Sequence, residues 1–323
     1  MPFNSVISRT DAAALIPEDV SYAILQGVAE GNPMLQLATR LPNMARAQQR
    51  MPVLGQLPIA YFVNGDTGLK QTTEMLWENK YLDAEEVAAI VPIPESVLDD
   101  AEYDIWGQIR PRLVAAFNKA IVQAVLYGTN IPATWTTNLG GAGIVAGANS
   151  AGHVISIAAY TDLYEAIMGE KDDGTDGLLM LIEADGFMAN GHLAHTSLRG
   201  KLRNTRDADG NPIFTRSMQD RSRYDLDGEP IFFPVDGTMV AASSLDVAGD
   251  WTQLVWAMRQ DMTYKVLTEA VIQDAAGTIV YNLAQQDMVA LRAVTRLGVA
   301  LPNPINEENE DDDTRFPFAV LTA

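Results

Sequence analysis

The stretch DIWGQIRPRLVAAFNKAIVQAVLY, from Asp104 to Tyr127, decides how this chain folds. Apolar residues that recur at every fourth position are typical of one face of an α-helix. Here they are Ile105, Ile109, Leu113, Phe117, Ile121 and Val125. Gly128 follows, and glycine commonly ends a helix. At about 1.5 Å per residue this helix spans on the order of 35 Å, so we expect a sheet or other helices to lie along it.

Pro111 stands inside this pattern. Proline lacks an amide hydrogen and clashes with the preceding turn, so it kinks a helix unless it occupies the first helical position. We therefore expect Pro111 to begin the longer helical segment. Residues Glu95 to Arg110 are expected to form a shorter helical approach to it.

The composition allows a globular protein with a sizeable core. The chain has 323 residues, 47% of them hydrophobic, which leaves room for one large domain or two to three smaller ones. It contains no cysteine, which excludes disulfides, thiol catalysis and cysteine-based zinc sites. No window approaches about 20 consecutive apolar residues, so no membrane span is expected. The first twenty residues lack the pattern of a signal peptide, which favours folding in the cytoplasm.

The formal net charge is -20. Tight nucleic-acid binding depends on basic side chains that neutralise phosphates. The charge therefore argues against a protein whose main role is to hold nucleic acid. It favours solubility, because the copies repel one another.

The first half of the chain reads as an arm followed by a long extended excursion. Residues 1–50 carry two short helical patterns, Asp19 to Glu30 and Met34 to Leu41. They could pack as a strap on their own domain or reach a neighbouring subunit. Residues 51–92 read as two strand-forming ends around a polar, glycine-marked middle. Isolated hairpins are marginal in water, so this excursion needs support from another surface.

Within this excursion and the rest of the chain we expect the following elements. The strand-like runs are Pro52–Leu54, Ala60–Val63, Trp77–Tyr81, Val87–Ile93, Leu178–Ile182, Pro230–Val235, Trp251–Trp256, Thr263–Ile272 and Val289–Ala300. Two further helices are expected at Tyr160–Gly169 and Asn190–Leu202. Thr129–Gly152 reads as a loop between domains; it lacks the Gly-Lys-Ser/Thr of a phosphate loop. The acidic run Glu307–Asp313 reads as a solvated loop, with metal binding as the alternative.

No catalytic, cofactor or metal site is predicted. His192 and His195 have the side chains of zinc ligands, but they stand three residues apart, and Leu193 occupies the place of a glutamate base. A metal-dependent enzyme that uses these two histidines is kept as a distant alternative. Asp207, Asp209 and Asn211 alternate as in a calcium loop, but Pro212 and the lack of a later glutamate favour a β-turn.

Taken in order, several segments together resemble one family. They are Met51–Leu54, Tyr61 through Lys70 to Tyr81, Val91–Glu95, Asp104–Thr129, Leu198–Gly200, Asp209–Ile213 and Val294–Gly298. This order is similar to that of the major capsid proteins of tailed bacteriophages, which have the Hong Kong 97-type fold. The resemblance covers nearly the whole chain and rests on the order of the segments.

The resemblance implies an α+β fold with four parts. These are an N-terminal arm (1–50), an extended β loop (51–92), a peripheral domain with the long spine helix (93–154 and 250–323) and an axial domain (155–249). It implies a structural protein, not an enzyme, with no cofactor. Hexamers and pentamers would build an icosahedral head around double-stranded DNA, which they would contact weakly, and assembly would take place in the host cytoplasm.

The resemblance also implies partners and leaves an alternative. A scaffolding protein and a portal are the partners of such shells, and whether a decoration protein reinforces the shell is left open; because the arm begins near Met1, we expect scaffolding to be a separate protein. Some relatives cross-link a loop lysine to an asparagine. Lys70 or Lys80 could be that lysine, but no matching asparagine and glutamate are evident, so no cross-link is expected. An encapsulin-like bacterial compartment, which encloses enzymes instead of a genome, is the alternative.

Overall fold

A computed structural model describes residues 32–63, 68–70, 72–100, 105–169, 176–206, 210–211, 214, 224–274 and 276–323. The described chain falls into two compact units. The smaller one contains Glu86–Phe117 and Gln260–Leu297. The larger one contains Asn32–Glu85, Asn118–Arg259 and Gly298–Ala323. The expected helix at Asp19–Glu30 and most of the turn at Asp207–Pro212 lie outside the described residues.

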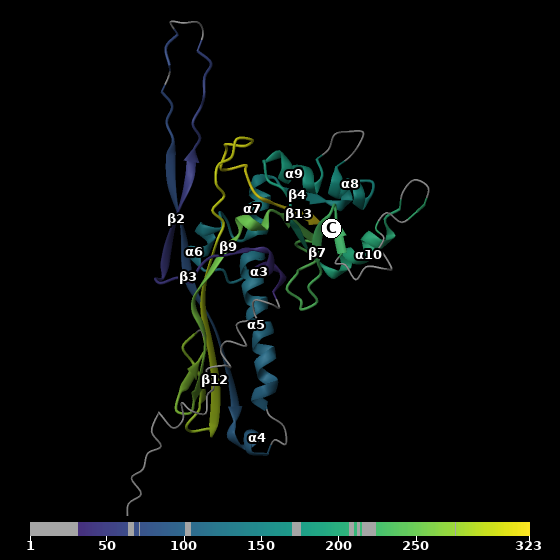
Figure 1. The fold of residues 1–323 in the computed structure, drawn as a ribbon. Helices are drawn as coiled ribbons and strands as arrows, with labels where there is room; N and C mark the ends of the chain where they lie inside the picture. The colour runs from purple at the N-terminus through teal and green to yellow at the C-terminus, as the bar shows by residue number, and fades with distance from the viewer. Residues whose placement is uncertain are drawn as a thin grey trace, which may run out of the picture. The chain divides into compact units, whose positions relative to one another are not determined.

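Most helices lie in the first two thirds of the chain, and strands predominate towards its C-terminus (Figure 1). The helices are α3 Pro33–Leu37, α4 Glu95–Asp100, α5 Ile105–Tyr127, α6 Ala133–Asn138, α7 Ile144–Ala151, α8 Leu163–Met168, α9 Leu178–Ala184 and α10 Thr196–Asn204, with short 3-10 turns η1 Ile157–Ala159 and η2 Trp251–Gln253. The strands are β1 Thr39–Arg40, β2 Gln48–Gln56, β3 Leu76–Pro94, β4 Val154–Ser156, β5 Gly191–Ala194, β6 Tyr224–Leu226, β7 Glu229–Phe232, β8 Asp246–Gly249, β9 Val255–Leu267, β10 Val271–Gln273, β11 Ile279–Asn282, β12 Met288–Ala300 and β13 Phe318–Thr322.

The long helix predicted from the apolar stripe is confirmed as the 23-residue α5. Leu113, Phe117, Ile121 and Val125 are all at most 5% exposed. The helix ends where expected, at a glycine in the left-handed region with φ of 67°.

The expectation that Pro111 begins a helix is wrong, since Pro111 lies inside α5. The half-buried Ile109 and the buried Leu113 continue the apolar stripe on either side of the proline. Burial of this stripe offsets the single backbone hydrogen bond that proline cannot make. The shorter helical approach predicted before Pro111 is present in part, as α4.

A five-stranded sheet has the strand order β1-β9-β12-β3-β2. Its β2 and β3 are antiparallel, with Gln48 opposite Asp83 and Leu54 opposite Trp77. This confirms the predicted two-stranded excursion. The runs expected at Trp77–Tyr81 and Val87–Ile93 form one 19-residue strand. The run expected at Ala60–Val63 is not a strand, because the chain has already left the β2 ladder at Gln56.

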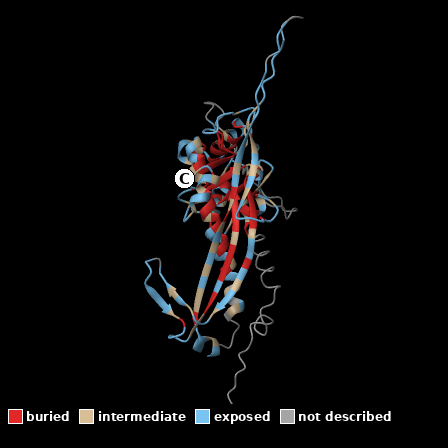
Figure 2. Ribbon diagram, turned by 90° about the vertical axis from the view of Figure 1, so that its left-hand side faces the viewer, coloured by how far each residue is buried: buried red, intermediate tan, exposed pale blue. Residues whose placement is uncertain are grey.

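A six-stranded sheet in the larger unit has the order β4-β13-β8-β5-β7-β6. Its core includes apolar residues of α8, α9, α10 and the central strands, such as Ile167, Ile182, Leu198 and Ala319. In Figure 2 the buried residues are concentrated in this region, whereas the far part of the β2–β3 hairpin is exposed throughout. The larger unit therefore has a core of its own.

Three expectations in this unit are wrong. Leu178–Ile182 is not a strand but part of α9, in which Leu178, Leu179 and Ile182 are buried at helical spacing. A short apolar run does not distinguish the two structures by itself. Asn190–Leu202 is not one helix but β5 followed by α10. Thr129–Gly152 is not a loop, because glycines at its turns separate two short helices, α6 and α7.

The strands near the C-terminus are partly as expected. Val289–Ala300 is confirmed as β12. Trp251 begins the 3-10 turn η2 instead of a strand, because Asp250 caps it by accepting from the Thr252 amide. The strand β9 then runs on to Leu267, so the boundary expected at Thr263 does not exist. None of the described helices is both long enough and apolar enough to cross a membrane.

We expect Gly249→Ala to destabilise the larger unit by about 2 kcal/mol or more, since overpacking a tight core typically costs 1–3 kcal/mol. A β-carbon at Gly249 would lie 2.3 Å from Phe318 Cδ1 and 2.5 Å from the Pro317 carbonyl oxygen. The matched control is Gly200→Ala in α10, where a β-carbon meets nothing within 4 Å. The control is expected to stabilise the helix by about 0.5–1 kcal/mol. Urea unfolding measures both variants, and equal changes in their free energies of unfolding would contradict this prediction.

Candidate assembly surface

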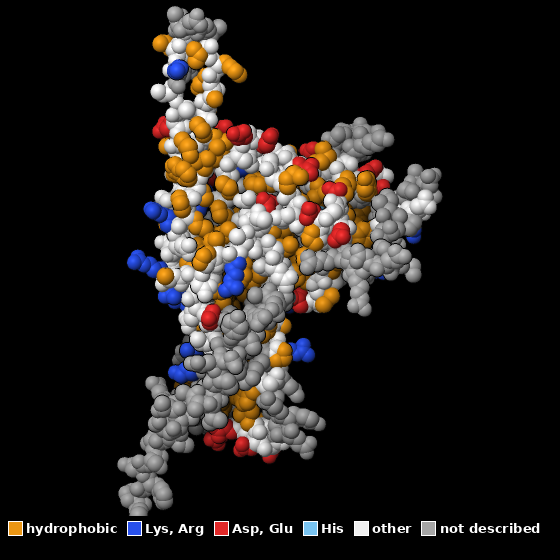
Figure 3. Space-filling model, in the orientation of Figure 1, with side chains coloured by type: hydrophobic (Ala, Val, Ile, Leu, Met, Phe, Trp, Pro, Cys, Tyr) orange, Lys and Arg blue, Asp and Glu red, His pale blue; other side chains and the backbone are white. Residues whose placement is uncertain are grey.

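The β2–β3 hairpin exposes apolar side chains along its length, both in its paired base and in its far part, the described residues between 57 and 75. Phe62 is 107% exposed, Leu69 90% and Trp77 65%. Figure 3 shows hydrophobic side chains gathered along this hairpin. The other large apolar residues exposed on it are Ile59, Tyr61, Val63, Met75, Leu76 and Tyr81. A large exposed apolar surface of this kind marks a site of interaction with another molecule.

The base of the hairpin is held by neighbouring elements of its own unit. The Trp135 indole nitrogen donates to the Asp83 carbonyl at 3.0 Å, and the Asn138 amide donates to the Asp83 carboxylate at 3.0 Å. Both come from α6. The Thr134 hydroxyl adds a hydrogen bond of 2.7 Å to Glu85. The base of the hairpin is therefore anchored to α6, while its far part is exposed.

A second feature beside the hairpin is the acidic loop, residues 302–314. Its acidic residues Glu307, Glu308, Glu310, Asp311, Asp312 and Asp313 are all exposed, as the solvated-loop prediction requires. Figure 3 shows acidic side chains next to the base of the hairpin. Among the described residues no group of three or more histidine or acidic side chains could hold a metal ion, so the metal alternative for this loop has no support there.

The acidic loop is wrapped around one buried cation. Arg315 is 3% exposed. Its guanidinium donates to the carbonyl oxygens of Asn309 and Asn303, at 3.0 and 3.2 Å, and to the Asp312 carboxylate at 2.9 Å. A planar guanidinium with several donors suits such a role, because it can satisfy acceptors from different points of a loop.

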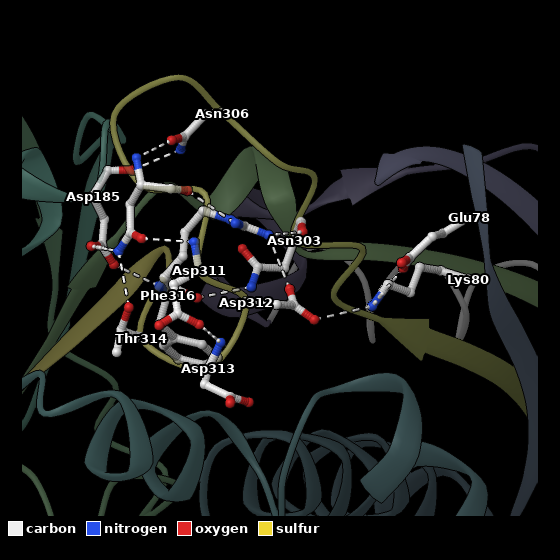
Figure 4. Close-up of polar contacts among 12 residues, drawn as sticks. Glu78, Lys80, Asp185, Asn303, Asn306, Asp311, Asp312, Asp313, Thr314 and Phe316 are labelled. Carbon is white, nitrogen blue, oxygen red and sulfur yellow. Dashed lines mark hydrogen bonds and ion pairs between the residues drawn. The ribbon is translucent and has the colours of Figure 1, made fainter. Parts of the chain in front are cut away.

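Asp185 fastens the loop to the core of the larger unit. Its carboxylate accepts from the Phe316 amide at 2.6 Å and from the Asn309 side-chain amide at 2.7 Å. Its carbonyl accepts from the Asn306 side chain at 2.7 Å. His153 Nε2 lies 3.3 Å from the same carboxylate. Figure 4 shows Asn306 and Phe316 beside Asp185, which is only 6% exposed.

Two contacts then join the acidic loop to the hairpin. Lys80 of β3 lies 3.8 Å from the Asp312 carboxylate, with Glu78 on its other side at 4.0 Å (Figure 4). The Ile305 amide donates to the Leu54 carbonyl of β2 at 3.4 Å. The loop and the hairpin base are thus parts of one surface.

The two histidines of the metal-enzyme alternative are not brought together as ligands. His192 lies in β5 and is fully buried, with its Nδ1 2.8 Å from Asp246 Oδ2. His195 caps α10, where its ring nitrogen Nδ1 accepts from the Ser197 amide at 3.1 Å. Both rings have structural partners.

Sequence reasoning found the hairpin but missed Asp185 and Arg315. Nothing in the local pattern marks Asp185 as buried, since it follows a helix that was interpreted as a strand. Arg315 comes directly after the acidic run, where a solvated side chain is the ordinary expectation. The available signal was the regular spacing of Asn303, Asn306 and Asn309 before it, because asparagines often make such loop contacts.

Comparisons with known proteins agree with this architecture. The family model described as phage capsid family matches residues 12–305. A solved chain from Microbacterium phage Oxtober96 has a TM-score of 0.75 at 32% identity, and the match covers 98% of this chain and 99% of that one. A chain from Mycobacterium phage Adephagia has a TM-score of 0.73 at 28% identity, with 98% of each chain covered. No curated protein sequence matches the chain.

A more distant solved structure shares the fold. It is described as the capsid of a native GTA particle and has a TM-score of 0.58 at 17% identity, over the full length of both chains. Capsid proteins are structural, which confirms the prediction that this chain is not an enzyme. The family match spans most of the sequence, and the 32% identical structure covers 98% of it, so the chain belongs to the phage capsid family.

Proposed function

We propose that copies of this chain assemble as hexamers and pentamers into an icosahedral head that encloses double-stranded DNA. The observation that carries the proposal is the exposed apolar far part of the β2–β3 hairpin. Phe62 and Leu69 are large apolar side chains, but no other described residue covers them. In a shell, a neighbouring copy supplies the missing cover.

Each of the four parts of the chain then has its own role in the shell. Residues 155–249 form the axial domain, which meets its copies around each capsomer axis. Residues 93–154 and 250–323 form the peripheral domain with α5 as the spine helix. The arm, residues 1–50, and the extended loop, residues 51–92, lie across neighbouring subunits.

The charge supports a container for DNA. A net charge of -20 repels phosphates, so the inner wall would confine the genome without holding it. A scaffolding protein and a portal are the proposed partners, with a decoration protein as an optional addition, and assembly takes place in the host cytoplasm.

Electron microscopy of the protein expressed alone, after size-exclusion chromatography, tests the proposal. Closed shells, tubes, or rings of five or six copies are the expected result. A species that stays monomeric or dimeric across salt and protein concentration, and also with a scaffolding protein from the same genome, would overturn it. Shells that co-purify with an enzyme cargo would instead support a bacterial compartment.

A hairpin variant tests the observation itself. We expect Phe62→Ser to leave the thermal unfolding temperature within about 1 °C, because surface substitutions are usually within ±0.5 kcal/mol. The yield of shells should fall by about tenfold or more, as expected for a residue at the centre of an interface. Val235→Ser is the matched control, since Val235 is 88% exposed but lies outside the hairpin. Equal shell yields for the two variants would contradict the role given to the hairpin.

A further inference from the structure

The base of the β2–β3 hairpin has two different faces. Side chains alternate between the faces of a strand, and residues directly opposite one another share a face. Lys80 and its partner Met51 therefore share the face that meets the acidic loop, where Lys80 pairs with Asp312. Tyr81 and its partner Arg50 point to the other face.

This second face is open to solvent around Arg50, Trp77 and Tyr81, whereas Asp83 at its end is held by the Asn138 side chain of α6. Trp77 is 65% exposed and Tyr81 41%, and Arg50 is exposed. Leu54, opposite Trp77 in the ladder, lies on the same face. Arg50 forms no ion pair with any residue in the described part of the chain. The uncovered face therefore combines two aromatic rings with a guanidinium that has no carboxylate partner.

The acidic loop has the complementary properties. Glu307, Glu310 and Asp313 are exposed, and their carboxylates form no ion pair with any residue in the described part of the chain. The loop nevertheless keeps a fixed shape, because the buried Arg315 and Asp185 hold it from within. A pre-shaped acidic loop loses little conformational entropy when it binds a partner.

We propose that the uncovered face of the hairpin base, with Arg50 beside Tyr81 and Trp77, receives the acidic loop of a second copy of this chain. The inference rests on the proposed shell-forming function, because both partners are copies. Beyond that function, the inference identifies the two surfaces that meet when copies assemble. Arginine suits the contact, since its planar guanidinium binds carboxylates in pairs and stacks on aromatic rings.

Two properties favour a second copy over another partner. The two surfaces lie on the same unit, on opposite faces of one hairpin, so each copy can give its loop to one neighbour and its basic face to another. Such a contact between different surfaces is heterologous, the type that forms rings when the rotation from one copy to the next closes. It also brings together opposite charges in a chain whose net charge of -20 otherwise makes its copies repel.

A cysteine pair provides the direct test, because the chain contains no cysteine of its own. Shells of the variant Arg50→Cys with Glu310→Cys would be treated with a short bis-maleimide and analysed on a denaturing gel. A ladder of cross-linked copies is expected. The control pairs Glu310→Cys with Arg203→Cys, an exposed arginine on α10, and should give no ladder. Intact shells of the test pair without a ladder would overturn the inference and leave the proposed function standing.

A charge exchange provides the second test. Arg50→Glu, and separately Glu310→Lys with Asp313→Lys, should each raise the protein concentration needed for half-maximal assembly by about tenfold at low salt, because like charges then meet. All three substitutions together should restore most of the loss. High salt should reduce the effects, since exposed charges are screened. If Arg50→Glu behaved like Arg203→Glu, the inference would fail; if the unaltered chain never assembled, the failure would lie with the proposed function.

Discussion

Asp246→Ala is expected to lower the free energy of unfolding by about 1–3 kcal/mol, the cost of leaving a buried hydrogen-bonding group without its partner. Asp246 of β8 and His192 of β5 are both 0% exposed and lie on neighbouring antiparallel strands. Their side chains are 2.8 Å apart. Without the carboxylate, the His192 ring would stay buried with no partner for Nδ1. Urea unfolding followed by circular dichroism measures the loss.

The control for this prediction removes both partners. The variant Asp246→Leu with His192→Leu should recover most of the stability, because an apolar pair of similar volume avoids the desolvation cost. Asp99→Ala, at an exposed position of α4, should change the free energy by less than about 0.5 kcal/mol. A loss below about 1 kcal/mol for Asp246→Ala would show that the pair does not organise the six-stranded sheet.

The elements that the sequence predicted well are those whose burial pattern repeats along the chain. The stripe through Leu113, Phe117 and Val125 has helical spacing over several turns, so tertiary packing and local pattern agree. The long strand β12 was also recognised, whereas the single strand β3 was predicted as two separate runs. The proline that was expected to begin a helix shows the limit, because burial of the stripe overrides a local cost.

The elements that were misread are short and owe their structure to distant contacts. Leu178–Ile182 is apolar enough for a buried strand, but it packs as a helix in the core next to Ile167 and Leu198. His192 belongs to β5 because its neighbours in the sheet are Ala248 and Ile231, each of which lies tens of residues away in sequence. Pairings between strands that are distant in sequence produce no periodic pattern of apolar residues in the local sequence.

The hairpin could be predicted from the local sequence, whereas the shape of the acidic loop could not. The hairpin was predictable, because strand-forming ends flank a glycine-marked middle. The loop was correctly expected to be solvated, but its fixed shape depends on Asp185, more than a hundred residues earlier in the chain. A single sequence contains no signal for a contact over that separation.

Asp185→Ala is expected to lower the free energy of unfolding by about 3 kcal/mol and to release the acidic loop. The substitution removes the acceptor for the Phe316 amide and for the Asn309 side chain, and it leaves His153 without its buried partner. A buried donor that loses its acceptor costs about 1–3 kcal/mol, and the groups here share one carboxylate, so their losses are not additive. Hydrogen exchange of the Phe316 amide should become at least about tenfold faster, as each 1.4 kcal/mol of lost protection is a factor of ten.

Asp312→Ala is the matched control within the same loop. Asp312 is 62% exposed at its side chain and pairs with Lys80 and Arg315, so its loss should cost no more than about 1 kcal/mol. Exchange at Phe316 should stay unchanged, because the bonds to Asp185 remain. If Asp312→Ala also released the loop, the surface pair and not the buried carboxylate would hold it. If neither variant changed exchange at Phe316, the contacts around Asp185 would not fix the loop. The shape that the loop offers to a second copy would then have to form when the two copies meet.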